Sequence, residues 1–297
     1  MEKRINRIDL ADYRDLEQIL GGILKLIPDL EPPVPVEALA ADLDISEIKD
    51  MDVDGFVGAI ITDRERSDGV ILVKKELREQ RRRFTIGHEL GHFLCPTHIP
   101  PKGNSFYCTG ADMGTYYAKK SNIAALMEVQ ANNFSANLLM PTKLVRLRIP
   151  SKADPHLQHV LDLCKTFNTS KEMTARRYVD VQSLPCALVV SKDGKVRYPL
   201  RHEDFPYLPS LTGKPLPPKS LSANVAFQPG YLSDPVGIAP LTWLADNQAR
   251  RADYLSEQVL VQQDGYRLTL LTAVLKDEEE EDEDKELRES WTPRFHR

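Results

Sequence analysis

Apolar residues recur at every third or fourth position in several stretches of the chain, a spacing typical of helices that bury one face. Pro28 ends the first stretch, because proline cannot continue a helix. Thr169 and Glu172 match a capping box, which predicts where the last of the helices begins. The pattern predicts helices over residues 9–27, 36–43, 75–94, about 128–140, 156–167 and 171–181.

Other segments are rich in β-branched residues and are separated by short polar turns, which favours β-hairpins. Asp-Gly sequences mark the turns at Asp193-Gly194 and Asp264-Gly265. The turn before residue 70 contains Ser67-Asp68-Gly69. The predicted strand pairs are 55–61 with 69–73, 185–190 with 195–198, and 255–263 with 266–275.

This mixture of helical and β patterns predicts an α+β fold. Residues 1–150 are expected to combine helices with a small β-sheet, and residues 184–276 to form a second, β-containing domain. Residues 151–183 would be a helical segment between them. The tail, residues 277–297, begins with eight consecutive acidic residues and is predicted to be disordered.

The helical segment 151–183 has the spacing of a helix-turn-helix, but a hairpin packed on the core is the favoured interpretation. Arg176 and Arg177 are too few positive charges to bind a phosphate backbone, and no row of base-reading side chains is visible. Direct DNA binding is therefore not expected.

Charge and cysteine content exclude some classes of protein. The 297 residues carry a net charge of −5, and removing the eight acids of the tail leaves +3, which is far from the basic extreme of nucleic-acid-binding proteins. The four cysteines show no paired spacing that would indicate a disulfide framework or a cysteine-type zinc site. No signal peptide or apolar run of membrane-spanning length is visible, so a reduced, cytoplasmic protein without membrane attachment is expected.

The most informative stretch is His88-Glu89-Leu90-Gly91-His92, within the helix predicted over 75–94. Residues four apart lie on one face of a helix, so His88 and His92 can direct their imidazoles to one point. Two neutral imidazoles can bind Zn²⁺, and the adjacent carboxylate of Glu89 can take a proton from a water that the metal activates. The pattern therefore predicts a zinc site with a general base.

Gly87 and Gly91 each precede one of the two histidines. A glycine inside a helix costs about 1 kcal/mol of stability relative to alanine. Two of them in one helix therefore indicate that another element approaches this face closely. The opposite, core-facing side is supplied by Ile86, Leu90, Phe93 and Leu94.

A catalytic zinc site needs a third protein ligand, and the residues leave two candidates. His98 has the position of the third histidine in the extended three-histidine motif, but Cys95 and Pro96 stand where the chain would have to reverse direction. Glu128 lies on the helix predicted around 128–140, and small side chains beside it would allow close packing on the first helix.

The two helices carry two distinctive motifs. The first is His88-Glu89-Leu90-Gly91-His92, and the second is Glu128-x-x-Ala131-Asn132-x-Phe134-x-x-x-Leu138-Leu139-Met140-Pro141. Together they resemble the ImmA/IrrE family of bacterial zinc metallo-endopeptidases, over roughly residues 30–182. The resemblance implies a zincin-like peptidase domain in residues 1–150.

The resemblance also implies a role for each residue of the site. His88, His92 and Glu128 would bind one Zn²⁺ per chain, with Mn²⁺ as an activating substitute, and Glu89 would be the general base. His98 would not be a ligand. Relatives with three domains carry a GAF-like sensor fold at the C-terminus, which is the implied fold of residues 184–276.

The function implied is an intracellular endopeptidase that cleaves a protein, such as a helix-turn-helix repressor, to switch on stress or mobile-element genes. The alternatives are a non-catalytic transcriptional regulator with a structural metal site and a toxin–antitoxin partner that acts by binding. A structural site would need a fourth protein ligand, for which His98 is a candidate.

The connection between the two motif helices, residues 95–121, is long and contains several tyrosines. A long loop beside a site is often a lid, so this segment is expected to be mobile and to control access. Tyr116 and Tyr117 are candidates for the group that stabilises the oxyanion.

Overall fold

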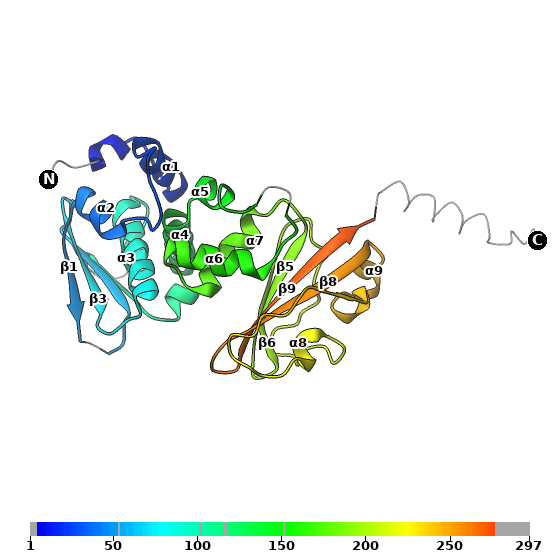
Figure 1. Ribbon diagram of the computed structural model, residues 1–297. Helices are drawn as coiled ribbons and strands as arrows, with labels where there is room; N and C mark the ends of the chain where they lie inside the picture. Colours follow the sequence, from blue (N-terminus) through cyan, green and yellow to red (C-terminus); the bar gives the residue numbers. More distant parts are fainter. Residues whose placement is uncertain (1–4, 53, 101–102, 116–117, 151–152, 277–297) are drawn as a thin grey trace, which may run out of the picture. The chain divides into compact units, whose positions relative to one another are not determined.

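The computed structural model describes residues 5–52, 54–100, 103–115, 118–150 and 153–276, in helices and two β-sheets (Figure 1). The predicted α+β class is therefore confirmed. The chain divides into two compact units. Met1–Pro150 and Val160–Arg177 form the N-terminal unit, and Ser151–His159 and Tyr178–Arg297 form the C-terminal unit. The acidic segment 277–297 and the pair Tyr116 and Tyr117 lie outside the described residues.

The N-terminal unit contains a mixed four-stranded sheet in the order β1-β3-β2-β4. Strand β1 is parallel to β3, whereas β2 is antiparallel to both β3 and β4. The strands are β1 (Ile45–Met51), β2 (Gly58–Thr62), β3 (Gly69–Lys74) and β4 (Ser105–Cys108). The helices are α1 (Leu16–Leu26), α2 (Val36–Asp42), α3 (Glu79–Leu94), α4 (Ile123–Leu139) and α5 (Thr142–Arg146), with 3₁₀ turns η1 (Arg7–Leu10) and η2 (Asp112–Gly114).

The predicted hairpin of β2 and β3 is confirmed, but the sheet also contains two strands that were not predicted. Strand β1 is largely exposed and rich in polar residues, so its sequence lacks the alternation of apolar and polar residues that would have predicted a strand. Strand β4 has only four residues and lies in the connection that was expected to be a lid. Its mobility stays a prediction, although pairing with β2 makes the middle of this connection part of the sheet.

The predicted helix over residues 9–27 is wrong at its start. Residues Arg7–Leu10 form the 3₁₀ turn η1, and α1 begins only at Leu16. The Asp15 side chain accepts a hydrogen bond from the Gln18 backbone N–H at 2.8 Å and so caps the helix. The local cap therefore sets the boundary, although apolar residues at helical spacing continue before it.

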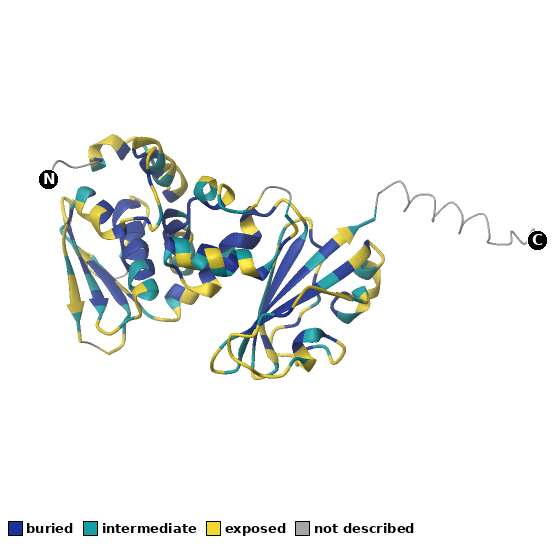
Figure 2. Ribbon diagram, in the orientation of Figure 1, coloured by how far each residue is buried: buried dark blue, intermediate teal, exposed yellow. Residues whose placement is uncertain are grey.

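Helix α3 lies against strands β2 and β3 on one side and against α4 on another. Every residue from Phe84 to Leu94 is buried, which Figure 2 shows as a dark blue helix. A Cβ at Gly87 would lie 2.6 Å from Ser135 Oγ, and a Cβ at Gly91 would lie 3.0 Å from the Phe134 ring. The close approach that the two glycines predicted is confirmed, and it brings α4 against the histidine face.

The C-terminal unit contains an antiparallel five-stranded sheet in the order β6-β5-β9-β8-β7. Both predicted hairpins are present, and their Asp-Gly turns have positive φ at both residues, as a type I′ turn requires. The strands are β5 (Cys186–Lys192), β6 (Lys195–Arg201), β7 (Val236–Ile238), β8 (Ala252–Val261) and β9 (Tyr266–Leu275). Short helices α8 (Leu221–Asn224), η3 (Pro240–Thr242) and α9 (Asp246–Ala249) join them.

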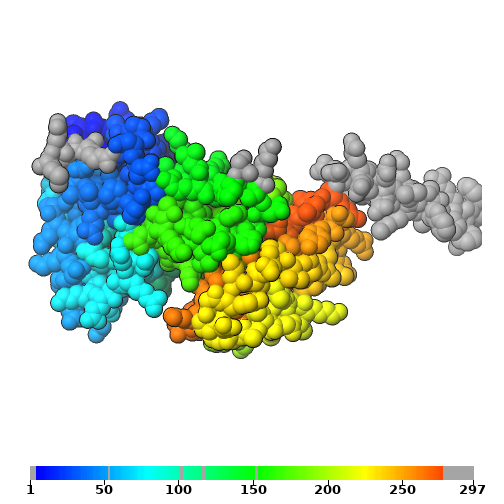
Figure 3. All heavy atoms as spheres, in the orientation of Figure 1, coloured from blue at the N-terminus to red at the C-terminus, as the bar shows by residue number. Residues whose placement is uncertain are grey.

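The proline-rich segment between β6 and β8 packs on this sheet. Phe205, Leu208 and Trp243 from the segment are buried in one cluster with Leu255 and Leu271 of the strands. In Figure 3 the yellow atoms of the segment lie beside the orange atoms of β8 and β9. Its apolar side chains therefore give the unit a core of its own.

The predicted helical pair is present as α6 (Leu157–Phe167) and α7 (Lys171–Val181), and the two units share both helices. The cap of α7 differs by one residue from the prediction. Ser170 Oγ accepts from the Met173 backbone N–H at 3.2 Å, whereas Thr169 Oγ1 bonds Thr174 Oγ1 at 2.7 Å. Ser170 is therefore the residue that caps this helix.

The structure also bears on disulfide bonds and on membrane-spanning helices. All four cysteines are unpaired, in agreement with the absence of a disulfide pattern. Among the described residues, none of the helices combines the length and apolar character that crossing a bilayer requires.

We expect Gly87→Ala to lower the free energy of unfolding by about 1–3 kcal/mol, because the added methyl group must displace Ser135 at the contact of α3 with α4. Gly21→Ala in α1 is the matched control, since nothing lies within 4 Å of its added Cβ. It should instead stabilise by about 0.5–1 kcal/mol. Urea unfolding of both variants measures the contrast, and equal effects would contradict the close packing at Gly87.

Candidate metal centre

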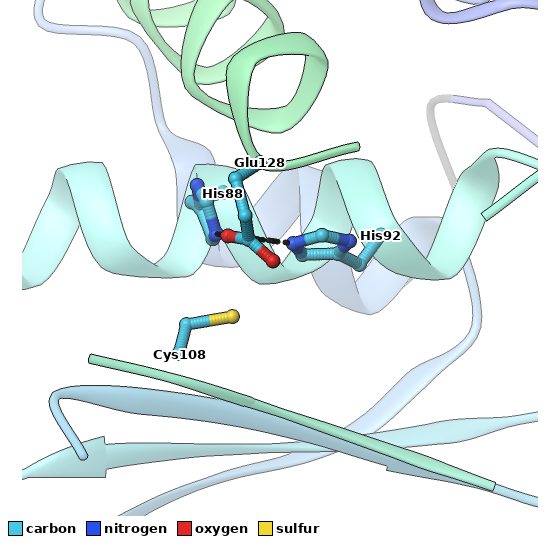
Figure 4. A group of neighbouring side chains, drawn as sticks. All are labelled: His88, His92, Cys108 and Glu128. Atoms are coloured by element: carbon cyan, nitrogen blue, oxygen red, sulfur yellow. Dashed lines mark hydrogen bonds and ion pairs between the residues drawn. The ribbon is translucent and has the colours of Figure 1, made fainter. Parts of the chain in front are cut away.

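Helices α3 and α4 bring together the four residues that the sequence singled out. His88, Glu89 and His92 lie on α3 and are fully buried, whereas Glu128 on α4 has a side chain that is 16% exposed. Figure 4 shows the two imidazoles and the Glu128 carboxylate directed toward one another, and Cys108 lying on the side of the sheet.

The distances among the three candidate ligands are short. His88 Nε2 lies 3.1 Å from His92 Nε2. Glu128 Oε2 lies 3.2 Å from the first of these nitrogens and 3.5 Å from the second. In a tetrahedral zinc site, nitrogen and oxygen ligand atoms are about 3.3–3.4 Å apart. The three atoms therefore have the spacing of ligands around one ion.

The protonation of His88 follows from Asn132, a residue of the second motif. Asn132 Nδ2 donates hydrogen bonds to the backbone oxygens of Asp112 and Thr115, at 2.9 and 2.8 Å, which fixes the orientation of the amide. Asn132 Oδ1 then accepts from His88 Nδ1–H at 2.9 Å. The proton is on Nδ1, so His88 Nε2 presents a lone pair to the centre.

The protonation of His92 follows from a chain of two hydrogen bonds. Gln130 Oε1 can only accept, so His98 donates to it from Nε2–H at 2.9 Å. His98 Nδ1 then accepts from His92 Nδ1–H at 3.0 Å. His92 Nε2 is consequently unprotonated and faces the centre. His98, fully buried, lies on the opposite side of the His92 ring from Glu128 and holds that ring in place.

The packing around His92 and His98 restricts both rings further. The ring of Phe106, on β4, stacks on the His92 ring with centroids 4.3 Å apart and planes at 20°. The Arg66 guanidinium donates to the backbone oxygen of Cys95 at 2.7 Å and to that of His98. The chain after α3 is therefore held where His98 can reach His92.

Three electron-pair donors thus converge with no proton between them, which is unfavourable unless a cation lies among them. Burial lowers the pKa of His92 to about 4, so protonation of the imidazole does not relieve the contact at neutral pH. Burial raises the pKa of Glu128, but the two histidines beside its carboxyl group lower that pKa more, to about 2, so Glu128 is a carboxylate. Two neutral imidazoles and one carboxylate are a donor set that fits a zinc-type ion.

Glu89 is a buried carboxylate beside this centre. Within the described residues, its Oε1 has no hydrogen-bond partner, and its Oε2 lies 3.7 Å from Cys108 Sγ. A Cβ at Gly58 of β2 would lie 2.5 Å from Glu89 Oε1, so only glycine leaves room for the carboxylate. Burial raises the pKa of Glu89 well above its ordinary value. A carboxylate kept buried without a partner is a candidate for proton transfer.

Comparison with protein families gives a match over residues 43–178, to the family described as Peptidase M78, IrrE N-terminal-like domain. Residues 43–178 match an IrrE N-terminal-like domain. The family relationship that the two motifs predicted is thereby confirmed, and the domain contains all the residues of the candidate metal centre.

Two further comparisons, with curated proteins and with solved structures, give no information about function beyond the match to the IrrE N-terminal-like domain. No curated protein matches the chain. A solved Mycobacterium tuberculosis transcriptional regulator is similar to 80% of this chain over 69% of its own, with 13% identity and a TM-score of 0.49. At that level the likeness carries no conclusion about function.

Sequence reasoning missed three participants in the centre of the IrrE N-terminal-like domain. Asn132 belongs to the second motif, and its position four residues after Glu128 was a signal that it faces the same site. Gln130 and Cys108 gave no such signal, because only the fold brings them to His98 and Glu89.

We expect Glu128→Ala to weaken metal binding far more than His98→Ala does. Removing Glu128 deletes one of three donor atoms, whereas removing His98 frees the His92 ring and its proton, a change that typically costs about 10–100-fold in affinity. His159→Ala, in the C-terminal unit, is the control and should leave affinity unchanged. Competition with a chelating dye measures all three constants.

The reverse order would contradict this assignment. If Glu128→Ala retained zinc while His98→Ala lost it, the site would be of the three-histidine kind that the sequence left open.

Proposed function

We propose that the chain is a zinc-dependent endopeptidase in which His88, His92 and Glu128 bind the metal and Glu89 is the general base. The observation that carries this proposal is the convergence of three unprotonated donor atoms beside a buried carboxylate oxygen without a hydrogen-bond partner. The centre lies within a domain of a peptidase family, which supports peptide hydrolysis as the reaction.

An ion held by His88, His92 and Glu128 would supply Lewis-acid chemistry, polarising a carbonyl oxygen and lowering the pKa of a bound water to about 7. Glu89 accepts the proton of the attacking water and later donates it to the leaving amine. Its raised pKa suits both steps, since the carboxyl group holds a proton between them. Asn132 and His98 keep both imidazole lone pairs directed at the centre throughout.

The substrate in this proposal is a protein segment in an extended conformation. Strand β4 is an edge strand of the sheet and carries Phe106 and Cys108 on the face toward the centre, with Tyr107 exposed on the other face. A peptide that pairs with an exposed edge gains backbone hydrogen bonds that do not depend on its side chains. By family resemblance, the substrate is a helix-turn-helix repressor, whose cleavage switches on stress or mobile-element genes.

The remaining parts of the chain receive regulatory roles. We propose the C-terminal unit as a sensor domain of the GAF-like kind, for which its antiparallel sheet with a separate core is the support. Residues 151–183 are proposed as a packed helical pair without direct DNA contact. The four unpaired cysteines support a reducing compartment such as the cytoplasm.

We expect Glu89→Gln to retain about one metal ion per chain and to lose peptide cleavage, because the amide cannot accept the proton from water. Glu79→Gln, at the exposed start of the same helix, is the matched control and should cleave like the unaltered chain. Each protein is loaded with zinc and incubated with a proteome-derived peptide library, and mass spectrometry counts the new termini.

Undiminished cleavage by Glu89→Gln would remove Glu89 from the reaction. Metal binding without cleavage by any form would instead favour the alternatives, a non-catalytic regulator or a toxin–antitoxin partner.

A further inference from the structure

Cys108 is the fourth residue of the cluster, and neither motif contains it. Along β4 the side chains of Phe106 and Cys108 are buried toward α3, and the Cys108 residue is 1% exposed. Its Sγ and the ligand atoms of His88, His92 and Glu128 all lie within 4.8 Å of one another. A thiol this close to three potential metal ligands is a candidate ligand itself.

The direction from which Cys108 approaches matters as much as the distance. The candidate ligand atoms of His88, His92 and Glu128 form a triangle with edges of 3.1, 3.2 and 3.5 Å, as three ligands of a tetrahedral ion would. Cys108 comes from the sheet, whereas Glu128 comes from α4 on the other side of the histidines (Figure 4). Sulfur and nitrogen ligands of a tetrahedral zinc ion are roughly 3.5–3.6 Å apart. The distances from Sγ to the other three ligand atoms are at most 4.8 Å, so a shift of roughly 1.3 Å or less in each would bring the sulfur within the range of a ligand.

We propose that Cys108 is the fourth protein ligand of the metal in the resting protein and closes the site to water. This inference rests on the metal site of the proposed function. A zinc ion with four protein ligands has the coordination of a structural site, whereas catalysis needs one open position. Hydrolysis in this chain therefore requires the sulfur to leave the metal first.

The proton balance of this step involves Glu89. As the metal–sulfur bond forms, the S–H bond of Cys108 breaks, and the proton passes to Glu89 Oε2, 3.7 Å from Sγ. When the sulfur leaves, the proton returns to it and Glu89 becomes a carboxylate again. The same movement thus opens the fourth position and restores the base.

Cobalt substitution tests the ligation without relying on catalysis. A thiolate bound to Co²⁺ gives a sulfur-to-metal charge-transfer band in the near ultraviolet. The unaltered chain should show this band, Cys108→Ala should bind one Co²⁺ without it, and Cys95→Ala should keep it. Cys95 is the matched control because it is also 1% exposed and is not a member of the cluster.

X-ray absorption of the unaltered zinc protein gives a measurement that needs no variant, with one sulfur expected at about 2.3 Å. A site with only nitrogen and oxygen neighbours, or a charge-transfer band that persists in Cys108→Ala, would overturn the inference. Metal bound without sulfur would leave the proposed function intact, whereas failure to bind metal at all would overturn both.

The proposal that Cys108 closes the site to water is tested separately, by the rate of peptide cleavage. With the peptide library, zinc-loaded Cys108→Ala should cleave at least several-fold faster than the unaltered chain, because its fourth position is always open. Equal or slower cleavage would show that Cys108 does not restrict the reaction.

Discussion

The close contact between α3 and α4 is the constraint on which the rest of the candidate site depends. Gly87 and Gly91 remove the side chains that would separate the helices, and Ser135 and Phe134 fill the space. Only this approach lets Glu128 reach the two imidazoles of α3. The interface between α3 and α4 stabilises the unit and also sets the distances among the three donor atoms. A substitution that alters the packing of these helices is therefore expected to alter the candidate metal site as well.

The side chains next to His88 and His92 determine which ring nitrogen of each histidine carries the proton. Asn132 and the pair of His98 and Gln130 each hold an Nδ1 proton away from the centre, so both Nε2 atoms are free. Partners of this kind orient metal ligands and raise their basicity. The two motifs indicate the three candidate ligands, whereas the tautomers of the histidines follow from their amide and histidine neighbours.

Local patterns predicted much of this architecture, because the residues concerned are close in sequence. The histidine pair, the glycines that precede it and the Asp-Gly hairpins all have signals within a few residues of one another. Strand β4 escaped prediction because four residues carry too little pattern, and its identity as a strand comes from pairing with β2. His98 was ambiguous for a related reason, since its role depends on Gln130, which only the fold brings to it.

The burial of the centre has a consequence for how an ion gets there. His88, Glu89 and His92 are fully enclosed, and only the partly exposed Glu128 gives one of these groups contact with solvent. Among the described residues of the centre, the Glu128 carboxylate is therefore the group that an ion arriving from solvent would meet first.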